Sequence, residues 1–176
     1  MTSRALIAFL LGAWLAGTLL MWAVATQNFR VVDRLLGAPA LEFSRRAALL
    51  ADGDARLLMR HQASEVNRLF FERWGWTQLA LGALLAWLVF SAPADRALRG
   101  TVVLMLLIAA VTQFAVVPET VRLGRLLDFA PRSAAGAPLG PEASRFWALH
   151  GAYTGLDLLK FFLGIFAGVR ALRGEG

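Results

Sequence analysis

Four apolar runs set the strongest limit on what this chain can fold into. They cover about residues 5–25, 76–92, 98–117 and 146–169, and each approaches the roughly 20 residues that an α-helix needs to cross a bilayer. The 176 residues are 58% hydrophobic and only 17% charged, whereas soluble domains are roughly 45–50% apolar and about 25% charged. A soluble core of that size does not fit so short a chain. We therefore expect one integral membrane domain, an all-α, antiparallel four-helix transmembrane bundle.

The connections between these runs are unequal in length. Residues 93–98 predict a short, proline-initiated turn that makes the second and third helices a hairpin. The first connection, about residues 28–74, has helical spacing with mixed charge, so we expect amphipathic interfacial helices there, interrupted at Asp52-Gly53-Asp54. Residues 131–140 are rich in Pro, Gly, Ala and Ser and predict a flexible loop.

The first run could also be read as a signal peptide, because Arg4 precedes it and Ala23-Val24-Ala25 is an A-x-A site. The run is longer than the roughly 7–15 apolar residues of such peptides, so we expect a retained helix. Four crossings put both termini on one side of the membrane. The density of arginine near the helix ends favours cytoplasmic termini, and the predicted location is a bacterial cytoplasmic (inner) membrane.

Charge and composition narrow the possible functions. The net charge is +6, but the arginines are dispersed among acids, which indicates contact with lipid headgroups rather than nucleic acid. The chain has no cysteine, which excludes disulfides and thiolate chemistry. The histidines are His61 and His150, and His61 lies in the first connection, so neither haem nor another cofactor or metal is expected. We recognise no nucleotide-binding loop or catalytic constellation and expect no enzyme activity.

A polar stripe runs along the fourth predicted helix. At about 100° per residue, His150, Tyr153, Asp157 and Lys160 fall on one face. A charge near the bilayer centre costs about 2.5–3.5 kcal/mol or more, so this face should turn inward. The other helices carry polar residues at the same depth, on the side of the long connections. The candidate ligand or ion pocket is Gln27, Asn28, Gln78, Gln113, His150, Tyr153, Asp157 and Lys160.

A weaker candidate lies just past the third apolar run. Pro118 should kink that helix, and Glu119 and Arg122 are spaced to pair along it. We consider Pro118, Glu119 and Arg122 either an ordinary surface pair or an interfacial gate for the pocket.

Two functions are compatible with these features. If the polar groups only bond across helices, the chain is a non-catalytic membrane subunit or assembly partner. Its partners are then the lipid bilayer and other membrane subunits or a second copy of itself. If the groups bind a ligand, an ion or a proton, the chain binds or transports it through a half-depth pocket beside the fourth helix. The sequence leaves both open.

Three stretches resemble a family of uncharacterised four-helix integral membrane proteins that includes the homologues of transmembrane protein 205. They are LHGAYTGLDLLKFFLG, VVPETVRLGRLL and EVNRLFFERWGWTQLALG. The first is similar to the family's His-Gly pattern in its last helix, the second to its proline-containing helix exit, and the third to its entry into helix two. Asp157 and Lys160 depart from the family pattern. The resemblance implies a four-helix membrane fold and no established enzyme activity.

Overall fold

The computed structural model of the chain describes residues 3–38, 40–51, 53–92, 94–130 and 140–173, and over these ranges every regular element is helical. The elements, in chain order, are α1 (Ser3–Gly37), α2 (Leu41–Ala47), α3 (Asp54–Ser91), α4 (Arg96–Val111), the π-helical segment η1 (Thr112–Val116), α5 (Val117–Asp128) and α6 (Pro141–Arg173).

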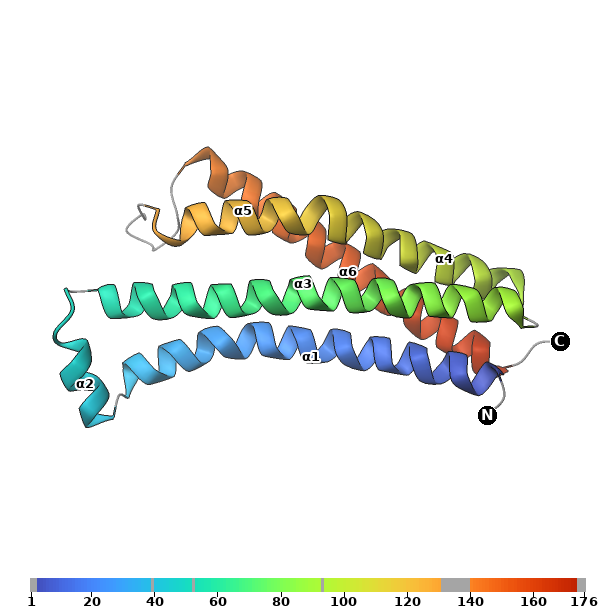
Figure 1. The fold of residues 1–176 in the computed structure, drawn as a ribbon, viewed down its shortest axis with the longest axis horizontal. Coiled ribbons are helices and arrows are strands. Elements are labelled where there is room, and N and C mark those ends of the chain that lie inside the picture. The colour runs from blue at the N-terminus through green and yellow to red at the C-terminus, as the bar shows by residue number, and fades with distance from the viewer. Residues whose placement is uncertain (1–2, 39, 52, 93, 131–139, 174–176) are drawn as a thin grey trace.

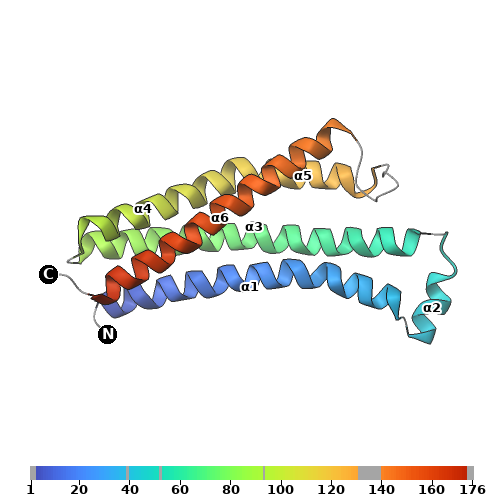
Figure 2. The same ribbon diagram turned by 180° about the vertical axis from the view of Figure 1, so that it is seen from behind.

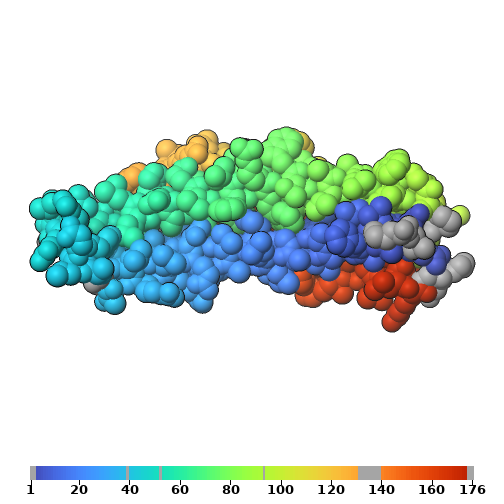
Figure 3. Space-filling view, turned by 60° about the horizontal axis from the view of Figure 1, so that its bottom comes forward, coloured from blue at the N-terminus to red at the C-terminus, as the bar shows by residue number. Residues whose placement is uncertain are grey.

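The long helices lie side by side in an elongated molecule (Figure 1). The helix α3 packs against α1 on one side and α4 on the other, and α6 packs against α1, α4 and α5. Both chain ends lie at the end where α3 is followed by α4, and α2 lies at the opposite end (Figure 2). Figure 3 shows α1 along one face, with α6 beside it over the half nearest the termini. The oblique α6 therefore approaches α1 near the termini and α5 near the other end.

The helices extend well beyond the apolar runs that predicted them. With 35 residues in α1 and 38 in α3, they are about 52 and 57 Å long at about 1.5 Å per residue. The expectation of separate amphipathic helices over residues 28–74 is therefore wrong for most of that segment, which forms the ends of α1 and α3. Only α2 is a short separate helix there. Mixed-charge residues continue a helix readily when its inner face still packs against a neighbour.

The predicted interruptions fall at different kinds of site. The break expected at residues 52–54 lies between α2 and α3, where Gly53 has a φ of 88°, a conformation that glycine adopts at little cost. Asp52, the turn residue Pro93 and most of the loop over 131–140 lie outside the described residues. After that turn, Asp95 caps α4, because its Oδ1 accepts from the Leu98 backbone N–H at 2.7 Å.

The third rod continues through Pro118 without a break in the helix, and its direction changes between α4 and α5 (Figure 1). Its helices α4 and α5 are joined without a gap by the π-helical η1, which directly precedes Val117 and Pro118. A proline lacks the N–H that would bond one turn back, and a wider π turn accommodates that loss within a helix. The rod consequently carries α5 along α3 and α6, where it supplies one wall of the site described below.

Three of the described helical segments are long and apolar enough to cross a membrane, by length and composition: Ser3–Gly37, Asp54–Ser91 and Arg96–Asp128. The helix α6 is not among them. Its apolar sequence is interrupted by Asp157 and Lys160, both of which are buried.

The apolar core fills the half of the molecule nearest the termini. Trp14 on α1, Val89 on α3, Met105 on α4 and Ala167 on α6 are at most 1% exposed and belong to one cluster. Burying side chains of this kind stabilises a fold by roughly 25 cal/mol per Å² of apolar surface. Most of the buried polar side chains lie outside this cluster, from the middle of the helices toward the α2 end: Asn67, Gln78, Thr112, Gln113, Asp157 and Lys160.

Candidate functional site

A buried polar layer lies midway along the helices. Lys160 and Asp157 are 1% and 2% exposed, and the Lys160 Nζ lies 3.1 Å from the Asp157 Oδ1. The Lys160 ammonium also donates to the Gln78 Oε1 of α3. From α1, the Trp22 Nε1–H donates to the Asp157 Oδ2 at 2.7 Å. We call these four residues, Trp22, Gln78, Asp157 and Lys160, the polar seam.

The seam joins three helices and its ion pair is internally matched. The charge of Lys160 meets that of Asp157, and each carboxylate oxygen faces a donor from the ammonium or from Trp22. Within the described chain, the Gln78 Nε2 is the buried seam atom that has neither an ion-pair nor a hydrogen-bond partner. Buried ion pairs that are matched in this way fix helix register more than they stabilise. The arrangement therefore suits a structural link better than an open conduit.

A cavity of about 160 Å³ lies beyond the seam, toward the α2 end. Four helices line it, and most of the surface that they present to it is apolar. The lining residues are Phe29 of α1; Ser64, Asn67, Arg68 and Phe71 of α3; Val117, Thr120 and Val121 of α5; Phe146, His150 and Tyr153 of α6. In this region α6 lies beside α5 and away from α1 (Figure 1). An apolar cavity of about 150 Å³ is large enough to hold a benzene-sized molecule.

Three polar side chains of the cavity wall, those of Ser64, His150 and Tyr153, have no hydrogen-bond partner among the described residues. The rings of His150 and Tyr153 are nevertheless fixed. His150 stacks on Phe146 with ring centroids 5.9 Å apart, and Tyr153 meets Phe71 edge to face at 5.4 Å. Both groups are thus oriented and able to bond a molecule in the cavity.

The amide of Asn67, by contrast, is already engaged. Its Oδ1 accepts from the Asn28 Nδ2 of α1 at 2.5 Å, and its Nδ2 donates to the Ala25 carbonyl at 3.2 Å. These two bonds tie α3 to α1 at the level of the cavity.

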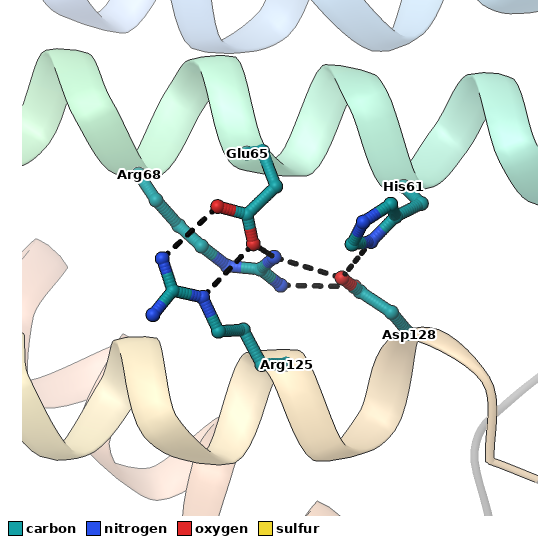
Figure 4. Close-up of polar contacts among 5 residues, drawn as sticks. All are labelled: His61, Glu65, Arg68, Arg125 and Asp128. Carbon is teal, nitrogen blue, oxygen red and sulfur yellow. Dashed lines mark hydrogen bonds and ion pairs between the residues drawn. The ribbon is translucent and has the colours of Figure 1, made fainter.

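A charged cluster connects α3 to α5 next to the cavity (Figure 4). Arg68 donates to both oxygens of Asp128, at 2.7 and 2.9 Å, and to the Glu65 Oε1 at 2.6 Å. Arg125 holds Glu65 with two bonds of 3.0 Å, and the His61 Nδ1 lies 2.7 Å from the Asp128 Oδ2. We call these five residues, His61, Glu65, Arg68, Arg125 and Asp128, the charged cluster. Two-pronged arginine–carboxylate pairs are the strongest of surface ion pairs.

The two guanidinium groups dominate the chemistry of this cluster. Hydrogen bonds from Arg125 and then from Arg68 lower the pKa of Glu65 from 4.5 to about 2, against the opposing effect of burial. Ligand atoms of His61, Glu65 and Asp128 lie within 4.8 Å of one another, a spacing that could hold a metal ion. The carboxylates already bind two arginines, however, and a cation would have to displace both. As arranged, the cluster is an ion-pair network.

The structure divides the predicted pocket residues among different places. Gln78, Asp157 and Lys160 come together in the polar seam, whereas His150 and Tyr153 line the cavity and Asn28 bonds beside it. Gln27 is exposed and is not among the residues that line the cavity. Gln113 is buried against α3, where its side chain occupies the space that a Cβ on Gly75 would need.

The predicted gate residues pair at the surface beside the cavity. Glu119 accepts from Arg122 at 2.7 and 2.8 Å and lies 2.9 Å from Arg145 at the start of α6. Pro118 is exposed. The cavity is lined instead by their neighbours Val117, Thr120 and Val121, so a gating role for Pro118, Glu119 and Arg122 stays a prediction.

Sequence reasoning missed Trp22 and the charged cluster. Trp22 lies in the first apolar run with no local sign of a polar role, because its bond to Asp157 joins residues 135 positions apart. The cluster lies in segments expected to be surface helices. The sequence did offer one signal for the cluster. The spacing of His61, Glu65 and Arg68 puts all three ionisable side chains on a single face of α3, where they can pair with one another.

Comparison of the chain with protein-family models, with curated proteins and with solved structures gives no match.

Proposed function

We propose that this chain is a multi-pass membrane protein, an antiparallel bundle of four transmembrane helices, that binds a small, mainly apolar ligand in the cavity between α1, α3, α5 and α6. The observation that carries the proposal is the cavity itself, about 160 Å³ and lined by four helices. Binding sites for small molecules are typically concave and mainly apolar, with a few fixed polar groups. His150 and Tyr153 are such groups.

The helix proposed for the fourth membrane crossing is α6. Its length of 33 residues gives about 50 Å of helix, more than the roughly 30 Å of bilayer hydrocarbon. Its two central charges face inward and pair, which removes the main cost of placing them at membrane depth. The proposal also includes a relationship to the transmembrane protein 205 family and a location in a bacterial inner membrane.

A test of ligand binding uses purified protein in lipid nanodiscs. The probes are decylbenzene and a decyl-substituted benzoquinone, whose rings match the size of the cavity. We expect at least one probe to raise the thermal unfolding temperature in a saturable manner. The substitution Ser64→Leu fills the cavity and should abolish this effect, whereas Ser91→Leu, the same change at the exposed end of α3, should preserve it. Absence of saturable binding of both probes would overturn the proposal.

The second candidate is a non-catalytic subunit or assembly partner. Large aromatic side chains are exposed along the outer surface, among them Trp87 at 64% and Phe114 at 63%, and another membrane protein or a second copy could cover them. Cross-linking in intact membranes tests this candidate, because a stable subunit should give a discrete higher-mass band, and recovery of monomer alone would count against it.

A further inference from the structure

The cavity also indicates the chemistry of its ligand. Resting on the proposed binding function, we infer that the ligand is an uncharged, planar ring that carries carbonyl oxygens and an apolar tail, the chemistry of a membrane-dissolved quinone. Four features of the wall support this assignment: its aromatic surfaces, its unused hydrogen-bonding groups, its balanced charge and its position along the helices.

Aromatic side chains form much of the wall. Phe29, Phe71, Phe146 and Tyr153 come from three different helices and line the same space. Aromatic faces and edges pack favourably against another ring in offset or edge-to-face geometry. A flat conjugated ring therefore matches this wall better than a branched or extended chain does.

The unused groups of the wall favour an acceptor on the ligand. The Tyr153 hydroxyl can donate one hydrogen bond, and a neutral His150 imidazole can donate one more. Neither group has a partner among the described residues. A ligand with one or two carbonyl oxygens would bond both, whereas a plain hydrocarbon would leave them unbonded.

The charge of the wall is already balanced. Arg68 lines the cavity, but its guanidinium bonds Asp128 and Glu65. A carboxylate or phosphate ligand would have to compete with these two anions and would bring a further negative charge close to them. The cavity therefore selects against an anionic lipid, although a cation is present in its wall.

The position of the cavity suits a molecule dissolved in the membrane. Val117 is the last residue of the third apolar run and Phe146 is the first of the fourth, so both wall residues mark the membrane boundary of the proposed spans. His150 lines the cavity and is also exposed at the surface, so we expect an opening beside α6. A tail can pass through it into the lipid while the ring oxygens lie at the boundary.

The test compares three probes of equal tail length on the full chain in nanodiscs: a decyl-substituted benzoquinone, decylbenzene and decanoate. Binding is followed by quenching of intrinsic tryptophan fluorescence and by thermal stabilisation. Trp147 is a suitable reporter because its ring lies 5.7 Å from that of His150. We expect the benzoquinone to bind about tenfold more tightly than either of the others, the gain of two hydrogen bonds.

Variants of the unused groups provide the sharpest result. The substitution Tyr153→Phe keeps the ring and its contact with Phe71 but removes the hydroxyl. It should weaken benzoquinone binding about fivefold while decylbenzene binding stays unchanged, and His150→Leu should do the same. Thr154→Ala is the matched control, because the Thr154 hydroxyl bonds only the His150 carbonyl of its own helix, and it should leave all three affinities unchanged.

The outcomes separate this inference from the proposed function. If decylbenzene binds as tightly as the benzoquinone, or if Tyr153→Phe weakens both equally, the cavity binds a ligand but the assignment of carbonyl chemistry is wrong. Tighter binding of decanoate likewise overturns the uncharged class. If no probe binds in a saturable manner, the proposed function itself fails.

Discussion

Asp157 and Lys160 show what a single charged side chain costs in the interior of this molecule. The two groups are almost fully buried and 3.1 Å apart. Asp157→Asn alone leaves the ammonium without its counter-charge and should destabilise the fold by about 3–5 kcal/mol. The double variant Asp157→Asn with Lys160→Met should recover most of that loss. Unfolding by a denaturing detergent, compared with the wild type, measures both values.

If the Asp157→Asn variant were as stable as the wild type in this measurement, the polar seam would not be a structural link. The exposed Thr154, three residues earlier on α6, provides the control, and Thr154→Ala should change stability little.

A second residue-scale prediction concerns the close approach of α1 and α3. A Cβ at Gly17 would overlap the Trp74 ring, whereas a Cβ at Gly12 on the same helix would meet nothing within 4 Å. Gly17→Ala should therefore destabilise the protein by about 1–3 kcal/mol through overpacking. Gly12→Ala should be neutral or slightly stabilising, since alanine favours a helix. Thermal unfolding of both variants is the measurement, and equal unfolding temperatures would contradict the packing argument.

At this scale the sequence predicted the inward-facing polar residues where they interrupt an apolar run, and Gln78 is one of them. The inward position of Asp157 and Lys160 follows from the cost of charge in lipid, and the structure buries both. Gln27 carries no such cost just past the end of the first apolar run, and it lies exposed. The rotation of α1 that brings Trp22 inward instead depends on packing with helices far along the chain, which no local pattern records.

At the scale of elements, the charged cluster should make the contact between α3 and α5 dependent on pH. The pKa of Glu65 is lowered from 4.5 to about 2, so its stabilising contribution is complete above pH 4.5 and is lost as the pH falls toward 2. With spin labels at Leu69→Cys and Leu126→Cys, both exposed positions, the distance between α3 and α5 should stay constant down to about pH 4.5 and broaden below it.

A matched pair of arginine variants tests the cause of this dependence. Arg125→Gln removes the principal partner of Glu65, so loosening should begin at a higher pH than in the parent protein. Arg122→Gln changes an exposed arginine that pairs with Glu119 instead and should leave the profile unchanged. Identical profiles for the two variants would show that the Glu65–Arg125 pair does not hold these helices together.

Helix existence was easier to predict than helix length. The apolar runs over residues 5–25 and 76–92 located parts of α1 and α3, but the residues from about 28 to 74 mostly extend these same helices. Mixed charge and helical spacing are typical both of a surface helix and of a rod that continues past the membrane. Only contact with neighbouring rods distinguishes them, and here α1 and α5 supply that contact to α3.

On the scale of the whole molecule, the chemical character of the interior changes stepwise along the long axis. The apolar core lies near the termini, the polar seam lies midway, and the cavity and the charged cluster lie toward α2. The all-helical architecture follows from composition and apolar spacing. The position of the cavity does not, because it depends on the oblique course of α6 (Figure 2). This order is also consistent with a membrane-spanning bundle whose cavity and charged cluster lie at one membrane boundary.

The central claim, four crossings with α2 on one side and both termini on the other, is tested most directly by labelling single cysteines in sealed vesicles. The chain has no cysteine of its own, so a membrane-impermeant maleimide reports one site at a time. The sites are Ser3, Ala48, Ala94, Ser144 and Leu172, each changed to cysteine. We predict that Ser3, Ala94 and Leu172 label from one side and Ala48 and Ser144 from the other. Labelling of Ser144 and Leu172 from the same side would contradict the account, because α6 would then not cross the membrane.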